Sequence, residues 1–192
     1  MIKLGITGGI GSGKSVVARL LELRGVPVYI ADAESKRLVD SSPEIRERLI
    51  TLFGEALYAA GTLDRRMLAS LIFGDAERLA RVNAIIHPAV RRHFEAWARR
   101  QKVPLCAIES AILFESGFDR TVDASLMVYA PRALRIQRAS TRDAAPLAEI
   151  ERRIDSQMPD EEKRRRADYV ILNDDCHALI PQVERLLAQY RL

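Results

Sequence analysis

The chain has 192 residues, of which 48% are hydrophobic and 29% charged, and its formal net charge is +4. A chain of this length is expected to form one compact core with a small insertion, because domains hold roughly 100 to 200 residues. No apolar run reaches the roughly 18 residues that a membrane span needs, so we expect a cytoplasmic protein with no membrane segment. Cys106 and Cys176 form no CxxC pair, which indicates a reducing compartment and argues against a zinc site.

The N-terminal residues show the pattern of strand, tight turn, helix and strand. Residues 2–7 form a short apolar run that ends at Gly8, and hydrophobic residues then recur at helical spacing until Gly25. Residues 26–31 are rich in β-branched and aromatic side chains, which predicts a second buried strand.

The middle of the chain, residues 33–102, is dense in helix signals and poor in strand signals. Ser42 and Pro43 are well placed as the N-cap and first residue of one helix, and Asp64 can cap another. We therefore expect a helical insertion here, set into a core formed by residues 1–32 and 103–192.

Three more apolar runs, at residues 104–108, 125–130 and 169–172, are predicted strands, and residues 179–190 have the spacing of an amphipathic helix. Strands that alternate with helices predict a parallel sheet with helices on both faces. The expected fold class is therefore α/β with three layers and a central parallel sheet of about five strands.

A glycine-rich segment, GGIGSGKS at residues 8–15, lies between the first strand and the first helix and fits the pattern GxxxxGK[ST] of a phosphate-binding P-loop. Such a loop directs backbone N–H groups at phosphate oxygens, which requires conformations open mainly to glycine. Lys14 is expected to reach the β- and γ-phosphates of ATP, and the Ser15 hydroxyl to ligate Mg²⁺. The ATP-binding residues expected from this segment are Gly8, Gly9, Gly11, Ser12, Gly13, Lys14, Ser15 and Val16.

Two other classes of nucleotide-binding protein are disfavoured. Neither Asn83 nor Asn173 precedes a lysine, so the chain lacks the NKxD element with which GTPases read guanine. Motor and helicase ATPases are normally longer and keep an aspartate after the third strand, where this chain has Glu109. The sequence fits a small-molecule kinase better. Its motifs to this point leave two classes of acceptor open, a nucleoside monophosphate or another small metabolite. A binding module that uses ATP only as a ligand, or a basic nucleic-acid binder, is the rival from another class.

Carboxylates at the carboxyl ends of the strands are candidates for the acceptor side of the reaction. Asp32 follows the second predicted strand, where a base for the acceptor hydroxyl is expected, although it can also cap the next helix. Glu109 ends the third strand, and three roles stay open for it: holding Mg²⁺ through water, binding the acceptor, or forming an ion pair.

A lid is expected at about residues 132–166, where ten basic residues stand against seven acidic ones. Most of these side chains are expected to be solvated on helix faces. Arg138 and Arg142 lie four apart on one predicted helix face and are the expected ATP contacts of this segment.

The motifs together resemble the dephospho-coenzyme A kinase family, over nearly the whole chain. In chain order they are TGGIGSGKS from Thr7, VYIAD ending at Asp32, GTLDRRML from Gly61, NAIIHPAV from Asn83, AILFESG from Ala111, RASTRD from Arg138, Gln157, and ADYVILN from Ala167. The resemblance implies ATP-dependent phosphorylation of the ribose 3′-hydroxyl of dephospho-CoA by a P-loop kinase. It also implies that residues 33–102 form the CoA domain.

The resemblance implies residue roles as well. Asp32 would be the base, Lys14 would bind phosphate, and Arg138 would close over the reaction. The implied substrate contacts are Thr7, Asp32, His87, Glu109, Leu113, Phe114 and Glu115, and Asn173 joins the ATP contacts. From the residues alone, His87 is more simply a capping or packing histidine.

Three positions depart from the pattern of many members: Ile30 stands for the first aspartate of DAD, Glu109 for an aspartate and Ala111 for a proline. None of these changes removes a group that the mechanism requires. The expected ligands are ATP, Mg²⁺ and dephospho-CoA, with no nucleic acid, in a monomer or small homo-oligomer.

Overall fold

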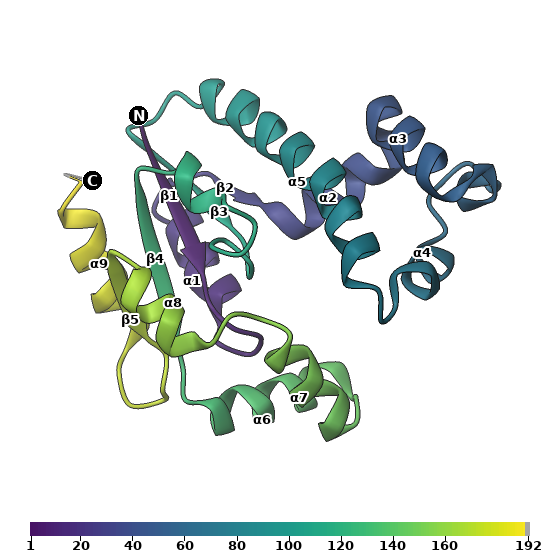
Figure 1. The fold of residues 1–192 in the computed structure, drawn as a ribbon. Helices are drawn as coiled ribbons and strands as arrows, with labels where there is room; N and C mark the ends of the chain where they lie inside the picture. The colour runs from purple at the N-terminus through teal and green to yellow at the C-terminus, as the bar shows by residue number, and fades with distance from the viewer. Residues whose placement is uncertain (191–192) are drawn as a thin grey trace. The chain divides into compact units, whose positions relative to one another are not determined.

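The computed structural model describes residues 1–190 of the chain. The chain divides into two compact units, with Met1–Ile30 and Arg100–Leu192 in unit 1 and Ala31–Arg99 in unit 2 (Figure 1). The boundaries expected from sequence, at residues 32 and 102, fall close to these limits. That unit 2 is a CoA domain stays a prediction.

Unit 1 is built on a sheet of five parallel strands, as predicted. The strands are β1 (Ile2–Thr7), β2 (Val28–Ile30), β3 (Leu105–Glu109), β4 (Ala124–Tyr129) and β5 (Tyr169–Leu172). Their order in the sheet is β2-β3-β1-β4-β5, and every neighbouring pair is parallel. The expected second strand was too long, because the backbone of Val26 bonds to Leu21 in the turn after the first helix and Ala31 begins the next helix.

The strand order places the P-loop at the centre of the sheet. β1 lies between β3 and β4, and the chain leaves it toward one side for β2 and β3 and toward the other for β4 and β5. Ligands of open α/β sheets bind at the carboxyl ends of the strands where the order reverses in this way. Ile6 pairs with Glu109, the last residue of β3, and Thr7, the last residue of β1, pairs with Met127, two residues before the end of β4. The three strands therefore end near the same edge of the sheet.

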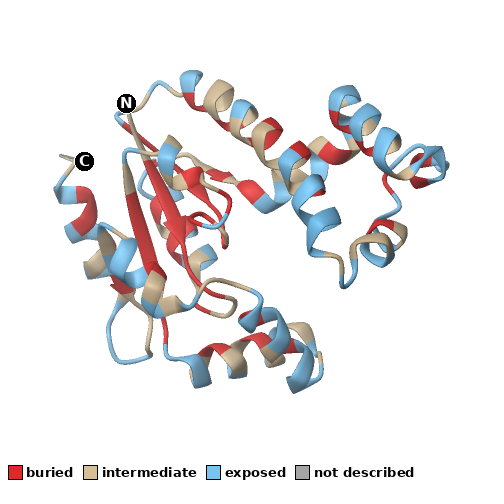
Figure 2. Ribbon diagram, in the orientation of Figure 1, coloured by how far each residue is buried: buried red, intermediate tan, exposed pale blue. Residues whose placement is uncertain are grey.

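Alternate residues of β1 face different layers of unit 1. Leu4 and Ile6 belong to a buried cluster with residues of α1 (Lys14–Glu22) and α9 (Leu179–Ala188). A side chain at Gly5 would instead meet Leu113 and Val122, from the segment between β3 and β4. Both faces of the central strand are therefore covered, and the strands are largely buried (Figure 2).

The segment expected to form a lid consists of three helices: α6 (Arg132–Asp143), α7 (Leu147–Asp155) and α8 (Asp160–Arg166). Ala139, Ile150 and Ile154 form a small buried cluster of α6 and α7, and Ile10 from the P-loop packs against it. The lid segment therefore contacts the tip of the P-loop directly. A short 3₁₀ turn, η2 (Phe118–Thr121), precedes β4.

Unit 2 is entirely helical among the residues described, as predicted. It contains α2 (Ala31–Ser41), α3 (Pro43–Phe53), a 3₁₀ turn η1 (Glu55–Tyr58), α4 (Arg65–Ile72) and α5 (Ala76–Arg99). The two predicted N-caps are confirmed, since the Ser42 side chain accepts a hydrogen bond from Ile45 N and that of Asp64 accepts one from Met67 N. Within residues 1–190, no helix combines the length and apolar character needed to cross a membrane.

Candidate nucleotide-binding site

The P-loop (residues 8–15) turns sharply between β1 and α1. Gly11 and Gly13 have φ angles of 79° and 85°, in the left-handed region that favours glycine. Ser12 N donates to Gly9 O at 3.0 Å, and Val16 N donates to Gly13 O at 2.9 Å as α1 begins. Ser15 and Val16 are exposed in the first turn of the helix, where backbone N–H groups favour an anion.

Neighbouring segments add a second reason for the glycines. A Cβ atom at Gly11 would overlap the backbone carbonyl of Arg135, and one at Gly13 would overlap the side-chain amide of Asn173. The glycines thus allow both the loop conformation and its close contact with α6 and with the residue after β5. The sequence predicted only the first of these constraints.

Lys14 and Glu109 meet beside the P-loop. Lys14 Nζ lies 3.4 Å from Glu109 Oε1, and the side chains are 18% and 7% exposed. Of the three roles left open for Glu109, the ion pair is therefore present. Thr7 Oγ1, of a predicted substrate contact, and Ser12 Oγ, of a predicted ATP contact, are buried and make no hydrogen bond within the described part of the chain. Their free hydrogen-bonding capacity suits a site that receives a polar ligand.

Asn173 connects the P-loop to Arg138. Its side-chain amide donates to Ser12 O at 2.8 Å. Its backbone carbonyl accepts a hydrogen bond of 2.9 Å from Arg138 Nη1. The other guanidinium arm of Arg138 bonds to Asp175. Three residues predicted as ATP contacts are therefore joined in one network.

Arg142, the other predicted ATP contact of the lid segment, has a different environment. Its guanidinium is 60% exposed and bonds to the adjacent Asp143 at 2.6 Å. Several other basic residues of the lid segment are paired with carboxylates too: Arg132 with Asp155, Arg135 with Asp160, Arg153 with Asp143, and Arg166 with Asp119. Much of the positive charge of this segment is therefore neutralised within unit 1.

Arg135, Asp160 and Gln157 were not assigned to the site from sequence. Arg135 Nη2 lies 2.8 Å from Asp160 Oδ2, and Arg135 Nη1 donates to Ile10 O at 3.3 Å. Gln157 Oε1 accepts a hydrogen bond of 3.1 Å from Ile10 N. Both backbone polar groups of Ile10, at the tip of the P-loop, are thus hydrogen-bonded to side chains of the lid segment. One signal was available, because Arg135 lies one helical turn before Arg138 and so shares its face.

Burial dominates the electrostatics of the Arg135–Asp160 pair. The two side chains are 5% and 10% exposed. Burial raises the pKa of the Asp160 carboxyl and lowers the pKa of the Arg135 guanidinium, and the attraction between them only partly offsets this. The pair therefore carries a desolvation cost at the point where it contacts the P-loop.

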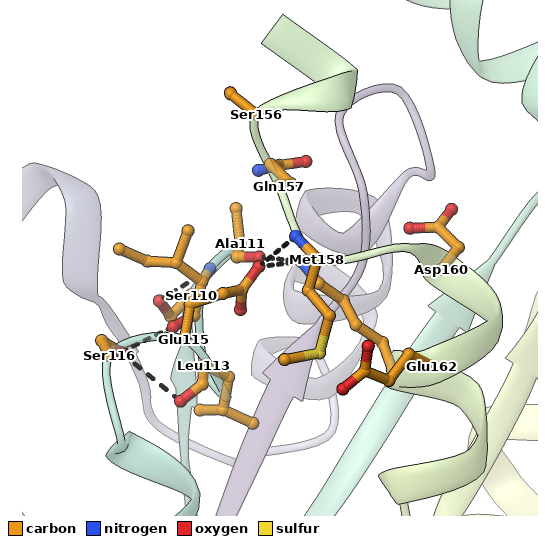
Figure 3. Close-up of polar contacts among 12 residues, drawn as sticks. Ser110, Ala111, Leu113, Glu115, Ser116, Ser156, Gln157, Met158, Asp160 and Glu162 are labelled. Atoms are coloured by element: carbon orange, nitrogen blue, oxygen red, sulfur yellow. Dashed lines mark hydrogen bonds and ion pairs between the residues drawn. The ribbon is translucent and has the colours of Figure 1, made fainter. Parts of the chain in front are cut away.

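The post-β3 loop (residues 110–117) carries three of the predicted substrate contacts. Leu113 is fully buried, and Phe114 packs under the guanidinium of Arg166 at 4.6 Å from the ring centroid. Glu115 bonds to groups of the lid segment (Figure 3). Contact of these three side chains with an acceptor stays a prediction.

Two predicted site residues belong to unit 2. Asp32 is exposed in the first turn of α2, and because that helix begins at Ala31, Asp32 does not cap a helix from residue 33 as the sequence allowed. His87 is half-buried in α5 before Pro88, and burial together with the charge of Arg91 lowers its pKa.

Comparisons with known proteins identify the family. The family model described as dephospho-CoA kinase matches residues 2–178. A dephospho-CoA kinase of Bacteroides fragilis is 51% identical, over 97% of this chain and 92% of the relative, and one of Porphyromonas gingivalis is 45% identical, over 100% and 95%. A crystal structure of a protein from Thermus thermophilus superposes with a TM-score of 0.84 at 41% identity, covering 98% of this chain and 95% of that one. Shikimate kinase from Acinetobacter baumannii, at 18% identity and a TM-score of 0.56, shares the P-loop kinase fold. Because the family model and these relatives each span most of the chain, the chain belongs to the dephospho-CoA kinase family.

Proposed function

We propose that the chain transfers the γ-phosphoryl group of ATP to the ribose 3′-hydroxyl of dephospho-CoA, releasing coenzyme A and ADP in the last step of coenzyme A synthesis. The observation that carries this proposal is the contact of Lys14 with the buried Glu109 beside the P-loop. It holds a cationic group next to a helix N-terminus that favours anions. Membership of the dephospho-CoA kinase family supplies the acceptor.

On the ATP side, the backbone N–H groups of the P-loop would bind the phosphates and Lys14 would neutralise the charge that develops on the transferring group. Arg138 would add a second positive charge, by exchanging its bond to Asp175 for the phosphates. Val16, Asn173 and Arg142 complete the proposed ATP contacts. Of these, Asn173 has direct structural support through its bond to Ser12.

The residues present also fit Mg²⁺. Residues 1–190 contain no cluster of three His, Cys, Asp or Glu side chains that could hold a metal alone. Mg²⁺ in kinase sites usually binds one or two protein oxygens together with phosphates and water, and the hydroxyl of Ser15, an exposed residue, would supply such an oxygen. Held there, the ion would supply positive charge that offsets the charge of the phosphates.

On the acceptor side, Asp32 would accept the proton of the ribose 3′-hydroxyl as that oxygen attacks the γ-phosphorus in line. Its exposure in the first turn of α2 leaves the carboxylate accessible to a substrate. Thr7, His87 and Glu109 are proposed to contact dephospho-CoA, and the post-β3 loop with Leu113, Phe114 and Glu115 would border it.

We also propose a cytoplasmic enzyme, a monomer or small homo-oligomer, that acts on small molecules and binds no nucleic acid. The ion pairs of the lid segment support the last point, because they leave much of its basic charge already matched by carboxylates.

The test is an acceptor comparison. ADP formation is followed with dephospho-CoA, adenosine, AMP and shikimate offered separately, and the position of the new phosphate is located. We expect acceleration by dephospho-CoA alone, with the phosphate on the ribose 3′-oxygen. Acceleration by AMP instead would favour a nucleoside monophosphate kinase, and ATP binding without any acceptor-dependent ADP release would favour a binding module.

A further inference from the structure

Lys163, in α8, is a charged side chain with no exposed surface. Its ammonium group donates to Ala111 O at 2.6 Å and lies 2.9 Å from Glu115 Oε1. Both partners belong to the post-β3 loop. A buried cation is stable only when it is paired and hydrogen-bonded in this way, so Lys163 fixes the position of that loop against α8.

The same oxygen of Glu115 makes a second bond, which reaches the connection between α7 and α8. Met158 N donates to Glu115 Oε1 at 2.9 Å, as Figure 3 shows by the dashed line between the two residues. The residue before it, Gln157, accepts the bond from Ile10 N at the tip of the P-loop. Two consecutive residues thus connect the post-β3 loop with the P-loop.

The contact of Ile10 is not an isolated one. Its carbonyl accepts a bond from Arg135, and its side chain packs against the buried cluster formed by Ala139, Ile150 and Ile154. A displacement of Met158 and Gln157 therefore acts on a P-loop tip that is held by packing and by hydrogen bonds on both sides. Connected packing and hydrogen bonds of this kind can carry energetic coupling between sites.

We propose that Glu115, held by Lys163, is a positioning residue that couples the post-β3 loop to the P-loop, so that acceptor binding at the one strengthens ATP binding at the other. The proposal rests on the proposed function, in which dephospho-CoA borders the post-β3 loop. By linkage, ATP must then strengthen acceptor binding by the same factor.

Two substitutions of one residue separate the hydrogen bond from the charge. Glu115→Ala and Glu115→Gln both remove the negative charge beside Lys163, so both disturb the buried cation. Only the glutamine keeps an Oε1 that can accept from Met158 N and from Lys163. The glutamine variant is therefore the matched control for the alanine variant.

The experiment measures the dissociation constant of the β,γ-imido analogue of ATP with and without saturating dephospho-CoA. In the parent, dephospho-CoA should lower this constant at least about 5-fold, the lower end of typical allosteric coupling. The effect should persist in Glu115→Gln and fall below about 2-fold in Glu115→Ala. If the bond from Met158 N to Glu115 served only folding, its loss would change stability. The ratio of the dissociation constants with and without dephospho-CoA would then stay unaltered.

The outcomes are distinguishable from those of the proposed function. If the parent phosphorylates dephospho-CoA but shows no coupling, or if Glu115→Ala keeps it, the inference is overturned while the function stands. Equal loss of the coupling in Glu115→Ala and Glu115→Gln would overturn the role of the bond to Met158. A parent that does not phosphorylate dephospho-CoA overturns the function itself.

Should Glu115→Ala fail to fold, the double variant Glu115→Leu with Lys163→Met takes its place. Replacing a buried ion pair by apolar residues is often neutral or stabilising, so this protein should fold. It lacks the bond to Met158 and should lack the coupling. Retained coupling in the folded double variant would overturn the proposal.

Discussion

The guanidinium of Arg135 and the carboxylate of Asp160 form a buried ion pair, 2.8 Å apart, that reaches the tip of the P-loop through the bond from Arg135 to Ile10 O. Residues far apart in the chain thus meet at the phosphate site. Removing one partner of such a pair leaves an uncompensated charge in a medium that solvates it poorly.

Asp160→Ala should therefore destabilise unit 1 strongly. We expect the free energy of unfolding to fall by about 3 to 5 kcal/mol, because Arg135 would stay buried without its carboxylate. Urea unfolding followed by far-UV circular dichroism measures this. Arg132→Ala, which removes an exposed ion pair with Asp155, is the control and should leave the unfolding midpoint close to that of the parent. Equal effects of the two substitutions would contradict the importance of burial.

Substitution of Gly11 should cost more stability than its left-handed backbone conformation alone explains. Gly11 and Gly25 have nearly equal positive φ angles, 79° and 82°, but a Cβ at Gly25 would meet nothing within 4 Å whereas one at Gly11 would overlap the Arg135 backbone. Gly25→Ala should cost about 1 kcal/mol of stability from the left-handed conformation alone. Gly11→Ala should cost more and should also weaken binding of the ATP analogue. Calorimetry of unfolding and of binding compares the two variants, and similar behaviour would show that the close contact is unimportant.

Local patterns accounted for most of the fold. The P-loop, the two helix caps at Ser42 and Asp64, and the five strands each follow from residues within a few positions of one another. The second strand was predicted too long, since an apolar run does not show where a turn or helix takes over its ends.

Contacts between distant segments could not be predicted in the same way. Lys163 precedes three arginines, and in the sequence all four have the character of a solvated helix face. Only the packing of α8 shows that Lys163 is buried against Ala111 and Glu115. For Arg142 the sequence predicted an ATP contact, because this residue shares a helix face with Arg138. In the structure its guanidinium instead bonds to the adjacent Asp143.

Lys14→Met should lower turnover by about 10²- to 10³-fold, the usual effect of removing one group that stabilises transition-state charge. The measurement is kcat for ADP formation at saturating ATP and dephospho-CoA. Lys102→Met, at an exposed position, is the control for removal of a lysine. A Lys14 variant with normal kcat would exclude the lysine from the reaction.

Asp32→Asn should lower turnover by about 10²- to 10⁴-fold, because asparagine cannot accept the hydroxyl proton. The dissociation constant of the ATP analogue should stay close to the parent value, since the proposed role lies on the acceptor side. Near-normal turnover would remove Asp32 from the role of base, and loss of nucleotide binding would indicate a structural role instead.

The lowered pKa of His87 predicts how the stability of unit 2 depends on pH. Burial and the charge of Arg91 keep this imidazole neutral in the folded state at pH values where the unfolded chain, with a pKa of about 6.5, binds a proton. Between the folded and unfolded pKa values the unfolded state holds more protons, so the free energy of unfolding should fall as pH decreases below about 6.5. His87→Gln should flatten this dependence. The fluorescence of Trp97, the single tryptophan, reports urea unfolding of unit 2 at each pH. The control for loss of a histidine is His177→Gln, at an exposed position of unit 1. An unchanged slope in His87→Gln would show that another group causes the dependence.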